Sequence, residues 1–207
     1  MKKLFAYNIG CLIVSAVLLA LALSGCAEKQ NSKADLFVSQ HAEEALKFAK
    51  QKGLNTNYAI FVDYSIPSGT PRLFVWDFKA QKIVARTYVM HGCGKGSTKE
   101  KPVFSNEINS ECSSLGKFKV FKDRHGAKIT RSFRMEGYDK TNSNAWNRGI
   151  MIHRSKWVDV WKWMKYIPLN RESCQGCITV GSKGMDNLES LIERESKPLL
   201  LWSYCSK

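Results

Sequence analysis

The sequence predicts a mainly β fold, a single curved sheet or β-sandwich with a few short helices and an N-terminal amphipathic helix. Three observations support this prediction. Runs rich in β-branched and aromatic residues recur along the chain, turn residues separate them, and only a few segments place apolar residues at helical spacing. The 207 residues contain no recognisable internal repeat or second domain.

Each element follows from its local pattern. Apolar residues recur at helical spacing from 35 to 52 before Gly53, so residues 34–54 are expected to form the N-terminal helix. Two long loops, His91–Ser114 and Thr141–Arg148, are expected to be functional or tied down. Strands are expected at Tyr58–Tyr64, Arg72–Phe78, Lys82–Val89, Gly116–Lys122, Lys128–Glu136, Gly149–His153 and Pro198–Tyr204, and short helices at Trp157–Tyr166 and Gly184–Glu195.

The N-terminus has the organisation of a secretory signal. Lys2 and Lys3 precede the apolar run Leu12–Leu23, which is too short to span a membrane comfortably. The tetrad Leu23-Ser24-Gly25-Cys26 resembles a bacterial lipobox, in which the cysteine is lipidated and becomes the first mature residue. An uncleaved membrane anchor is the alternative.

This pattern predicts the location of the protein. Residues 1–25 are expected to be a lipoprotein signal peptide, and residues 26–33 a lipidated N-terminus and polar tether. Lipid on Cys26 would anchor the chain to a membrane of the bacterial cell envelope, facing the periplasm. Ala27 after the lipidated cysteine, in place of aspartate, favours the outer membrane.

The charge of the chain indicates what it binds. The formal net charge is +14, and because residues 1–25 contribute only Lys2 and Lys3, residues 26–207 keep +12. Such a charge favours anionic membranes and the carboxylate-rich polymers of a bacterial envelope. The basic residues are scattered, and zinc-finger spacing, aromatic RNA-binding motifs and heptads are missing from the sequence, so nucleic acid is not an expected partner.

Five cysteines remain after the signal and the lipidated residue are set aside: Cys93, Cys112, Cys174, Cys177 and Cys205. An oxidising compartment favours disulfides, and an odd number leaves one thiol free. A local Cys93–Cys112 bridge is the preferred pairing, and a second one between Cys174 and Cys205 would leave Cys177 free. Sequence alone does not fix the connectivity.

Cys177 is the candidate nucleophile. It follows Gly176 and opens the apolar segment Ile178-Thr179-Val180, where glycine allows a tight turn and nearby amides can face an oxyanion. A buried structural thiol is one alternative. A redox pair with Cys174 is another, although a Cys-x-x-Cys redox motif normally opens a helix. Cys174 and Cys177 also have the only zinc-like spacing of Cys and His in the sequence, and no metal site is expected.

His153 is the candidate base, because it ends the apolar run that starts at Gly149 and lies 24 positions before Cys177. A nearby imidazole is the usual means of forming a thiolate near neutral pH. His91 ends a similar run before Gly92, and a site role and a hydrogen-bonded loop histidine are both open for it.

In order along the chain, five stretches match one family. They are Tyr58–Asp77; Val89-Met90-His91-Gly92 with Phe104-Ser105-Asn106; Ser113–Phe118; Gly149–His153; and Cys174–Cys177. Together they resemble the murein L,D-transpeptidase catalytic domain family, in the divergent lipoprotein branch of the YkuD-like fold. The resemblance covers about residues 55–204, so residues 55–207 are expected to be an L,D-transpeptidase-like catalytic domain.

The resemblance implies a cysteine acyltransferase or peptidase that acts on peptidoglycan stem peptides without a cofactor or metal. Cys177 would be the nucleophile and His153 its base. The amides of Gly176 and Cys177 would bind the oxyanion, and a carbonyl near Arg154 would orient the ring. Four further residues would line the site: Gln175, His91, Cys174 and Thr179.

Three positions depart from the family pattern. Cys174 occupies the serine position of the Ser-x-Gly-Cys motif, Thr179 replaces an arginine that many members carry, and Arg154 replaces a glycine. Cys174 could cap Cys177 reversibly as a disulfide. Two other functions therefore stay open, a catalytically inactive peptidoglycan-binding lipoprotein and a periplasmic thiol–disulfide protein that uses Cys174 and Cys177.

Overall fold

The computed structural model describes residues 33–124 and 132–206. By its internal contacts the chain divides into two units, residues 1–37 and 38–207, and all contacts of the site lie within the second. The predicted signal peptide and the lipidated Cys26 lie outside the described residues and stay predictions. None of the described helices is both long enough and apolar enough to cross a membrane.

The N-terminal helix spans residues 33–51, close to the predicted 34–54. Ala42, Ala45 and Ala49 recur every three to four residues and are buried, as expected for the core-facing stripe of an amphipathic helix. Gly53 follows the end of the helix, and its φ of 66° lies in the left-handed region that glycine adopts without strain.

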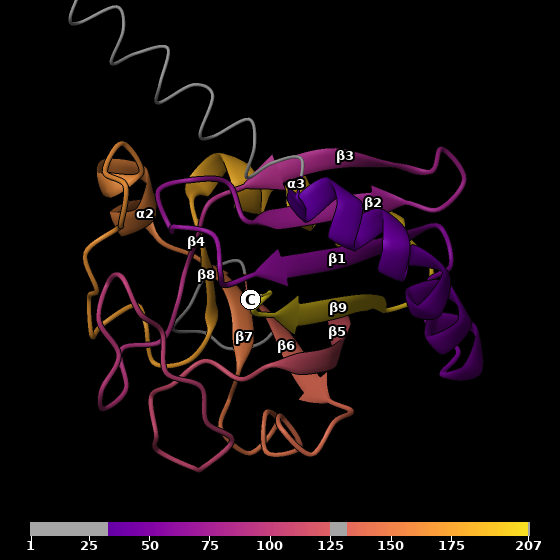
Figure 1. Cartoon of the computed structure of the whole chain (residues 1–207). Coiled ribbons are helices and arrows are strands. Elements are labelled where there is room, and N and C mark those ends of the chain that lie inside the picture. Colours follow the sequence, from indigo (N-terminus) through magenta and orange to yellow (C-terminus); the bar gives the residue numbers. More distant parts are fainter. Residues whose placement is uncertain (1–32, 125–131, 207) are drawn as a thin grey trace, which may run out of the picture. The chain divides into compact units, whose positions relative to one another are not determined.

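The nine strands form one continuous sheet (Figure 1). Their order across the sheet is β3-β2-β1-β9-β5-β6-β7-β8-β4. The bounds are β1 (Tyr58–Asp63), β2 (Leu73–Asp77), β3 (Lys82–Thr87), β4 (Val89–Met90), β5 (Gly116–Arg124), β6 (Ser132–Gly137), β7 (Met151–Arg154), β8 (Ile178–Val180) and β9 (Leu199–Tyr204). The prediction of a mainly β fold is confirmed, and of its two forms the structure has the single curved sheet.

The sheet nearly closes on itself. β3 and β4 are its two edge strands, yet only Tyr88 separates Thr87 at the end of β3 from Val89 at the start of β4. The edges must therefore approach each other at this point, since the two steps from Thr87 to Val89 span at most about 7 Å. The prediction of one strand over Lys82–Val89 is wrong for this reason: β-branched and aromatic residues continue through the segment, but the chain crosses from one edge of the sheet to the other within it.

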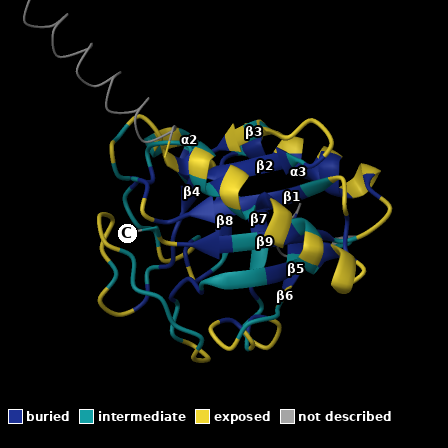
Figure 2. Cartoon of the chain, turned by 45° about the vertical axis from the view of Figure 1, so that its right-hand side comes forward, coloured by how far each residue is buried: buried dark blue, intermediate teal, exposed yellow. Residues whose placement is uncertain are grey.

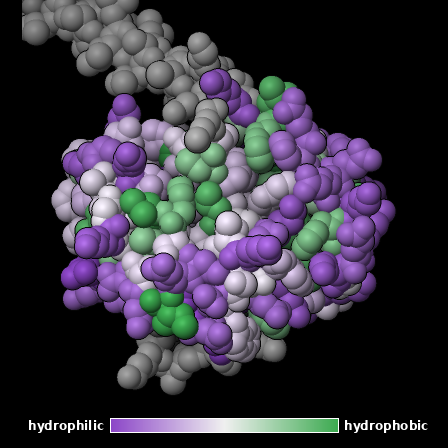
Figure 3. All heavy atoms as spheres, turned by 60° about the horizontal axis from the view of Figure 1, so that its bottom comes forward, coloured by the Kyte–Doolittle hydropathy of each residue, from purple (hydrophilic) through white to green (hydrophobic). Residues whose placement is uncertain are grey.

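The core lies on the inner face of this sheet. Its members include Ile60, Val75, Phe118 and Met135 from the strands, together with the apolar side of helix α3 (Ser182–Arg194). Strands are mostly buried, and exposed residues concentrate in helices and loops (Figure 2). On one face of the molecule the surface is mainly hydrophilic, with small hydrophobic groups between (Figure 3).

Helix α2 (Lys156–Trp161) is shorter than the predicted Trp157–Tyr166. The side chain of Ser155 caps its N-terminus by accepting a hydrogen bond from the Trp157 amide. The prediction fails beyond Trp161 because the next aromatic residue, Trp163, is 73% exposed and buries no helical face. α3 agrees with the helix predicted over Gly184–Glu195.

Candidate active site

Strands β7 and β8 bring the two candidate catalytic residues to one face of the sheet. The strands are parallel, with Ile152 opposite Ile178 and His153 opposite Thr179. Because successive side chains alternate between faces, Ile152 and Ile178 point into the core while Cys177, His153 and Thr179 project from the other face.

Cys177 lies immediately before β8 and is partly exposed. Its thiol faces the carbonyl oxygen of Gly149, with 3.9 Å between the sulfur and the oxygen. Burial raises the pKa of the Cys177 thiol, while a hydrogen bond from the Met151 backbone and the positive charge of Arg148 lower it. Because burial prevails, the resting residue is a neutral thiol that needs a base.

His153 is buried, with 7% of its surface exposed. Its Nδ1 lies 3.1 Å from the carbonyl oxygen of Arg154, the carbonyl expected to orient the ring, and its Nε2 lies 3.2 Å from Oγ1 of Thr179. Burial lowers the pKa of His153, and the Arg154 carbonyl opposes this effect. The ring is therefore neutral near pH 7, with the Nδ1 proton assigned from its carbonyl partner.

Nε2 of His153 and the carbonyl oxygen of Ser173 both lie within hydrogen-bond distance of the Thr179 hydroxyl. The Thr179 hydroxyl has a single proton and donates it to the carbonyl oxygen of Ser173 at 2.6 Å. Nε2 of a neutral His153 with its proton on Nδ1 therefore competes with Ser173 for that proton. Thr179, predicted to line the site, is fully buried and contacts the ring of His153 directly.

The hydrogen bonds of His153 within the described residues go to Thr179 and Arg154, not to Cys177. By register, Cys177 lies opposite Met151, two residues before His153. With strands about 4.8 Å apart and a rise of ~3.3 Å per residue, the Cα atoms of Cys177 and His153 are roughly 8 Å apart. The structure thus brings the predicted pair to the same face without a direct contact.

Gly176 adopts a backbone conformation that only glycine tolerates well. Its φ is 94°, and a Cβ atom there would lie 2.6 Å from the carbonyl oxygen of Cys112 and 2.9 Å from Nη2 of Arg148. This close approach fixes the segment that leads into Cys177. Gln175, on the other side of the glycine, is exposed.

Cys174 is fully buried against Met90, Val158 and Ile167, so it packs in a small core and not beside Cys177. Its thiol interacts with that of Cys93, which together with burial raises the pKa of Cys174, and the Cys93 amide donates to the Cys174 carbonyl at 2.7 Å.

The five cysteines among the described residues are free thiols. The predicted Cys93–Cys112 bridge is therefore not formed in this structure, and the same holds for a bond between Cys174 and either Cys177 or Cys205. The nearest thiol interaction of Cys174 is with Cys93, a pairing that the sequence analysis did not consider.

His91 lies in the interior, with only 1% of its surface exposed. Arg72 donates to its Nδ1 at 3.1 Å, so Nε2 carries the proton and faces the carbonyl oxygen of Thr98 at 2.8 Å. Burial and the adjacent Arg72 lower the pKa of His91 to about 4. These contacts match the hydrogen-bonded loop histidine and not a residue that lines an open cleft.

Arg154 contributes its carbonyl to the site while its guanidinium pairs with Asp186 on α3. The side chain therefore braces β7 against the helix. Its position after His153, where the family often has glycine, does not block the ring.

The sequence analysis missed Arg148. This residue ends the loop Thr141–Arg148 and is half-buried beside Gly176. The length of that loop was the one available signal, because the loop was expected to be functional or tied down. The structure ties it to the loop His91–Ser114 through Arg148 and through Asn144, whose amides bond to Asn106.

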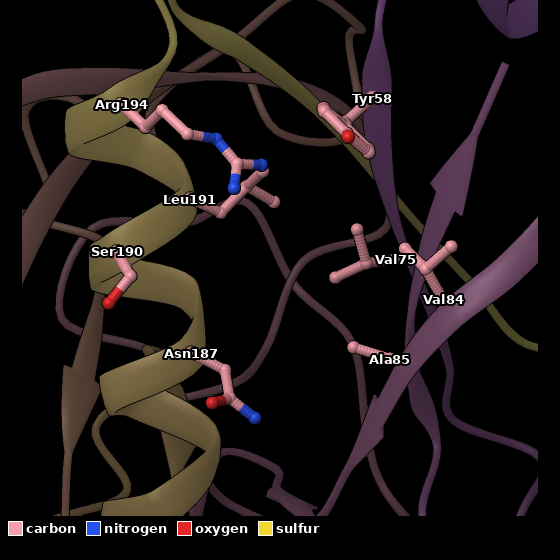
Figure 4. Close-up of a pocket in the computed structure, with 8 residues that line it drawn as sticks. All are labelled: Tyr58, Val75, Val84, Ala85, Asn187, Ser190, Leu191 and Arg194. Atoms are coloured by element: carbon pink, nitrogen blue, oxygen red, sulfur yellow. The ribbon is translucent and has the colours of Figure 1, made fainter. Parts of the chain in front are cut away.

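A cavity of about 320 Å³ lies away from this site, between the β1–β3 strands and α3 (Figure 4). Tyr58, Val75 and Val84 line it on the sheet side, and Ser190 and Arg194 on the helix side. Cysteine and histidine do not occur among its lining residues, so it offers no thiol chemistry. Among the described residues, no group of three His, Cys, Asp or Glu side chains could hold a metal ion.

The fold and the site define a mainly β protein with a partly exposed cysteine immediately before one strand and a neutral imidazole on the parallel strand beside it. The sequence profile of the L,D-transpeptidase catalytic domain family matches residues 28–202. Since this stretch is most of the chain, the protein belongs to that family, and membership supports a function related to peptidoglycan.

Solved structures with similar folds include the helical cell shape determining protein Pgp2 from Campylobacter jejuni, at 11% identity and a TM-score of 0.40, covering 73% of this chain and 49% of that one. An L,D-transpeptidase from Xylanimonas cellulosilytica DSM 15894 has 15% identity and a TM-score of 0.40, covering 76% and 68%. The Ldtfm–avibactam carbamoyl enzyme has 16% identity and a TM-score of 0.39, covering 73% and 50%.

The chain spans about half the length of the Campylobacter protein and of the carbamoyl enzyme. At these scores the solved structures describe a resemblance only, and the family assignment rests on the sequence profile. No curated protein matches the chain in sequence.

Proposed function

We propose that this protein is a cysteine L,D-transpeptidase, or a related L,D-carboxypeptidase or peptidase, that acts on peptidoglycan tetrapeptide stems through a Cys177 thioester. The observation that supports this proposal best is the placement of Cys177 and His153 on one face of adjacent parallel strands, in a chain that belongs to the L,D-transpeptidase catalytic domain family.

In the first half of the reaction, Nε2 of His153 takes the thiol proton of Cys177 and the sulfur attacks the carbonyl that joins the L-centre to the terminal D-alanine. The carbon–nitrogen bond of that amide breaks. The D-alanine amine leaves with the proton held by His153, and the rest of the stem stays on Cys177 as a thioester.

In the second half, an acceptor amine attacks the thioester, or water attacks it in a carboxypeptidase. His153 accepts the proton of the nucleophile and returns it to the departing sulfur, which restores the starting state. The amides of Gly176 and Cys177 are our candidates for binding the oxyanion in both halves, since the tight turn at Gly176 holds them just before β8.

His153 needs to turn its Nε2 from Thr179 towards Cys177 for the first step. Thr179 donates its hydroxyl proton to the carbonyl oxygen of Ser173, so it does not hold Nε2 with that proton, and the ring can turn. The Arg154 carbonyl can retain the other side of the ring and keep the tautomer. Catalytic hydrogen bonds are often loose until substrate binds.

We also propose that lipid on Cys26 anchors the enzyme in the cell envelope, with the catalytic domain facing the periplasm. The sequence of residues 23–26 supports this part of the proposal. The net charge of +12 on residues 26–207 suits both an anionic membrane and stem peptides that end in carboxylates.

Incubation with tetrapeptide muropeptides, followed by mass analysis, tests the proposal. The wild-type protein should release D-alanine, and Cys177→Ala and His153→Ala should abolish turnover. Cys174→Ala is the matched control: it removes a neighbouring thiol buried in a separate core and should retain turnover. Normal processing by the Cys177→Ala protein would refute the mechanism.

One observation favours a second candidate, a catalytically inactive peptidoglycan-binding lipoprotein. The ring of His153 contacts Thr179 and not Cys177. Thr179 stands where many family members have an arginine. Such a protein would bind sacculi but form no covalent adduct between Cys177 and a carbapenem. The thiol–disulfide alternative is less well supported, because Cys174 packs against Cys93 and not Cys177.

A further inference from the structure

Arg148 connects its own loop to a distant loop through three hydrogen bonds of its guanidinium group. Its Nη1 donates to the carbonyl oxygen of Ser105 at 2.8 Å and to Oγ of Ser114 at 2.5 Å, and its Nη2 donates to the carbonyl oxygen of Cys112 at 2.6 Å. One planar guanidinium thus holds three points of the loop that precedes β5.

The same guanidinium lies against the segment that carries the candidate nucleophile. Nη2 is 2.9 Å from the position that a Cβ on Gly176 would occupy, so only the missing side chain leaves room for it. Gly176 is joined directly to Cys177, and the positive charge of Arg148 lowers the pKa of the Cys177 thiol.

Few other charges act on this sulfur. Within residues 33–124 and 132–206, the charge that lowers the pKa of Cys177 is that of Arg148, and Tyr64, whose own pKa Cys177 helps to raise, is a buried phenol. His153, on the neighbouring strand, is bonded to Thr179 and Arg154. The guanidinium of Arg154 pairs with Asp186. Arg148 is therefore the cation that the described residues place against Gly176, next to Cys177 in the chain, with its charge acting on the thiol.

We propose that Arg148 is a positioning residue for Cys177: its guanidinium clamps the Ser105–Ser114 segment onto Gly176 and stabilises the Cys177 thiolate. It would supply the positive charge that many family members carry two residues after the nucleophile, where this chain has Thr179. The role in turnover rests on the proposed function, but the effect on the thiol does not, because it is a property of the free protein.

Two features of Arg148 can be separated by substitution. Gln keeps N–H donors for the carbonyl oxygens of Ser105 and Cys112 but removes the charge, and Met removes both. Lys keeps the charge but cannot form the planar fork that spans three acceptors. Arg194→Met is the matched control, since Arg194 is an arginine on α3 that lies over the ring of Tyr58 (Figure 4) and is not among the groups that shift the pKa of Cys177.

The experiment measures how fast iodoacetamide alkylates Cys177 as a function of pH, using the full chain purified in detergent. Cys177 and Cys174 share the tryptic peptide 172–183, so fragment-ion masses assign the label. Circular dichroism and urea unfolding first establish that each variant is folded, and if the Met variant does not fold, the Gln variant decides.

Arg148→Gln and Arg148→Met should shift the alkylation midpoint to higher pH and slow labelling at pH 7 by about tenfold, because less of the thiol is ionised at that pH. Arg148→Lys should keep the midpoint near that of wild type and yet lose muropeptide turnover. Arg194→Met should change neither. An unchanged midpoint in a folded Gln variant would overturn the inference.

The outcomes also separate this inference from the proposed function. If Arg148→Gln leaves the midpoint unchanged while Cys177→Ala abolishes muropeptide turnover, the role of Arg148 is wrong and the function stands. If the midpoint shifts but the wild-type protein never releases D-alanine, Arg148 tunes the thiol and the proposed function is wrong.

Discussion

Replacement of Gly176 by alanine tests whether the tight turn before Cys177 holds the site together. At a φ of 94°, an L-residue is strained by about 1–2 kcal/mol. The new methyl would also lie 2.6 Å from the Cys112 carbonyl oxygen and 2.9 Å from Nη2 of Arg148, and overpacking of this kind costs about 1–3 kcal/mol. We therefore expect the free energy of unfolding to fall by roughly 2–5 kcal/mol.

Gly53→Ala separates the two contributions. Gly53 also has a positive φ, 66°, but nothing lies within 4 Å of a Cβ built there, so this variant reports backbone strain alone. Urea unfolding of both variants and the wild type gives the comparison. The extra loss at Gly176 should be about 1–3 kcal/mol, and Cys177 should become more accessible to alkylation. Equal losses for the two variants would refute the close packing described around Gly176.

Two more predictions follow from the buried polar contacts. His91 has a pKa of about 4 in the folded protein, below its ordinary value, so the unfolded state binds more protons between pH 4 and about 6.5. The free energy of unfolding should therefore fall by roughly 3 kcal/mol as the pH decreases through this window. The lowered pKa of His153 acts in the same direction. Urea unfolding at several pH values measures this loss, and a His91→Gln protein with an equally steep dependence would contradict the assignment. Thr179→Val should lower the free energy of unfolding by about 1–2 kcal/mol because the carbonyl of Ser173 loses its donor, whereas Thr179→Ser should stay near wild type in the same assay.

Most of the fold could be predicted from local sequence. The strands β1, β2, β5 and β9 and the helix α3 were predicted to within a few residues, because each carries its own apolar pattern and turn residues at its ends. The split between β3 and β4 could not be predicted, since it depends on where the two sheet edges meet and not on local pattern. The predicted strand over Lys128–Glu136 begins outside the described residues, and its described part is β6.

The candidate site also has residues that local sequence predicts and residues that only the folded chain brings into place. Cys177 and His153 stand out because a strand-end histidine and a glycine–cysteine turn have recognisable spacing. The contacts of Thr179 and Arg148 cannot be read from the sequence, because they depend on the parallel register of β7 and β8 and on the folding of a loop whose contacts are 34–43 residues away from Arg148. The sequence left two roles open for His91, and the structure decides between them through its buried hydrogen bond with Arg72.

The most direct test of the central claim is the intact mass of the protein after brief incubation with a tetrapeptide donor and rapid acid quenching. We expect a mass increase equal to the donor acyl group after loss of D-alanine, mapped to Cys177 and missing from the Cys177→Ala protein. If the wild-type protein binds the donor and Cys177 carries no acyl group, or if the acyl group maps to another residue, the proposed thioester mechanism is contradicted.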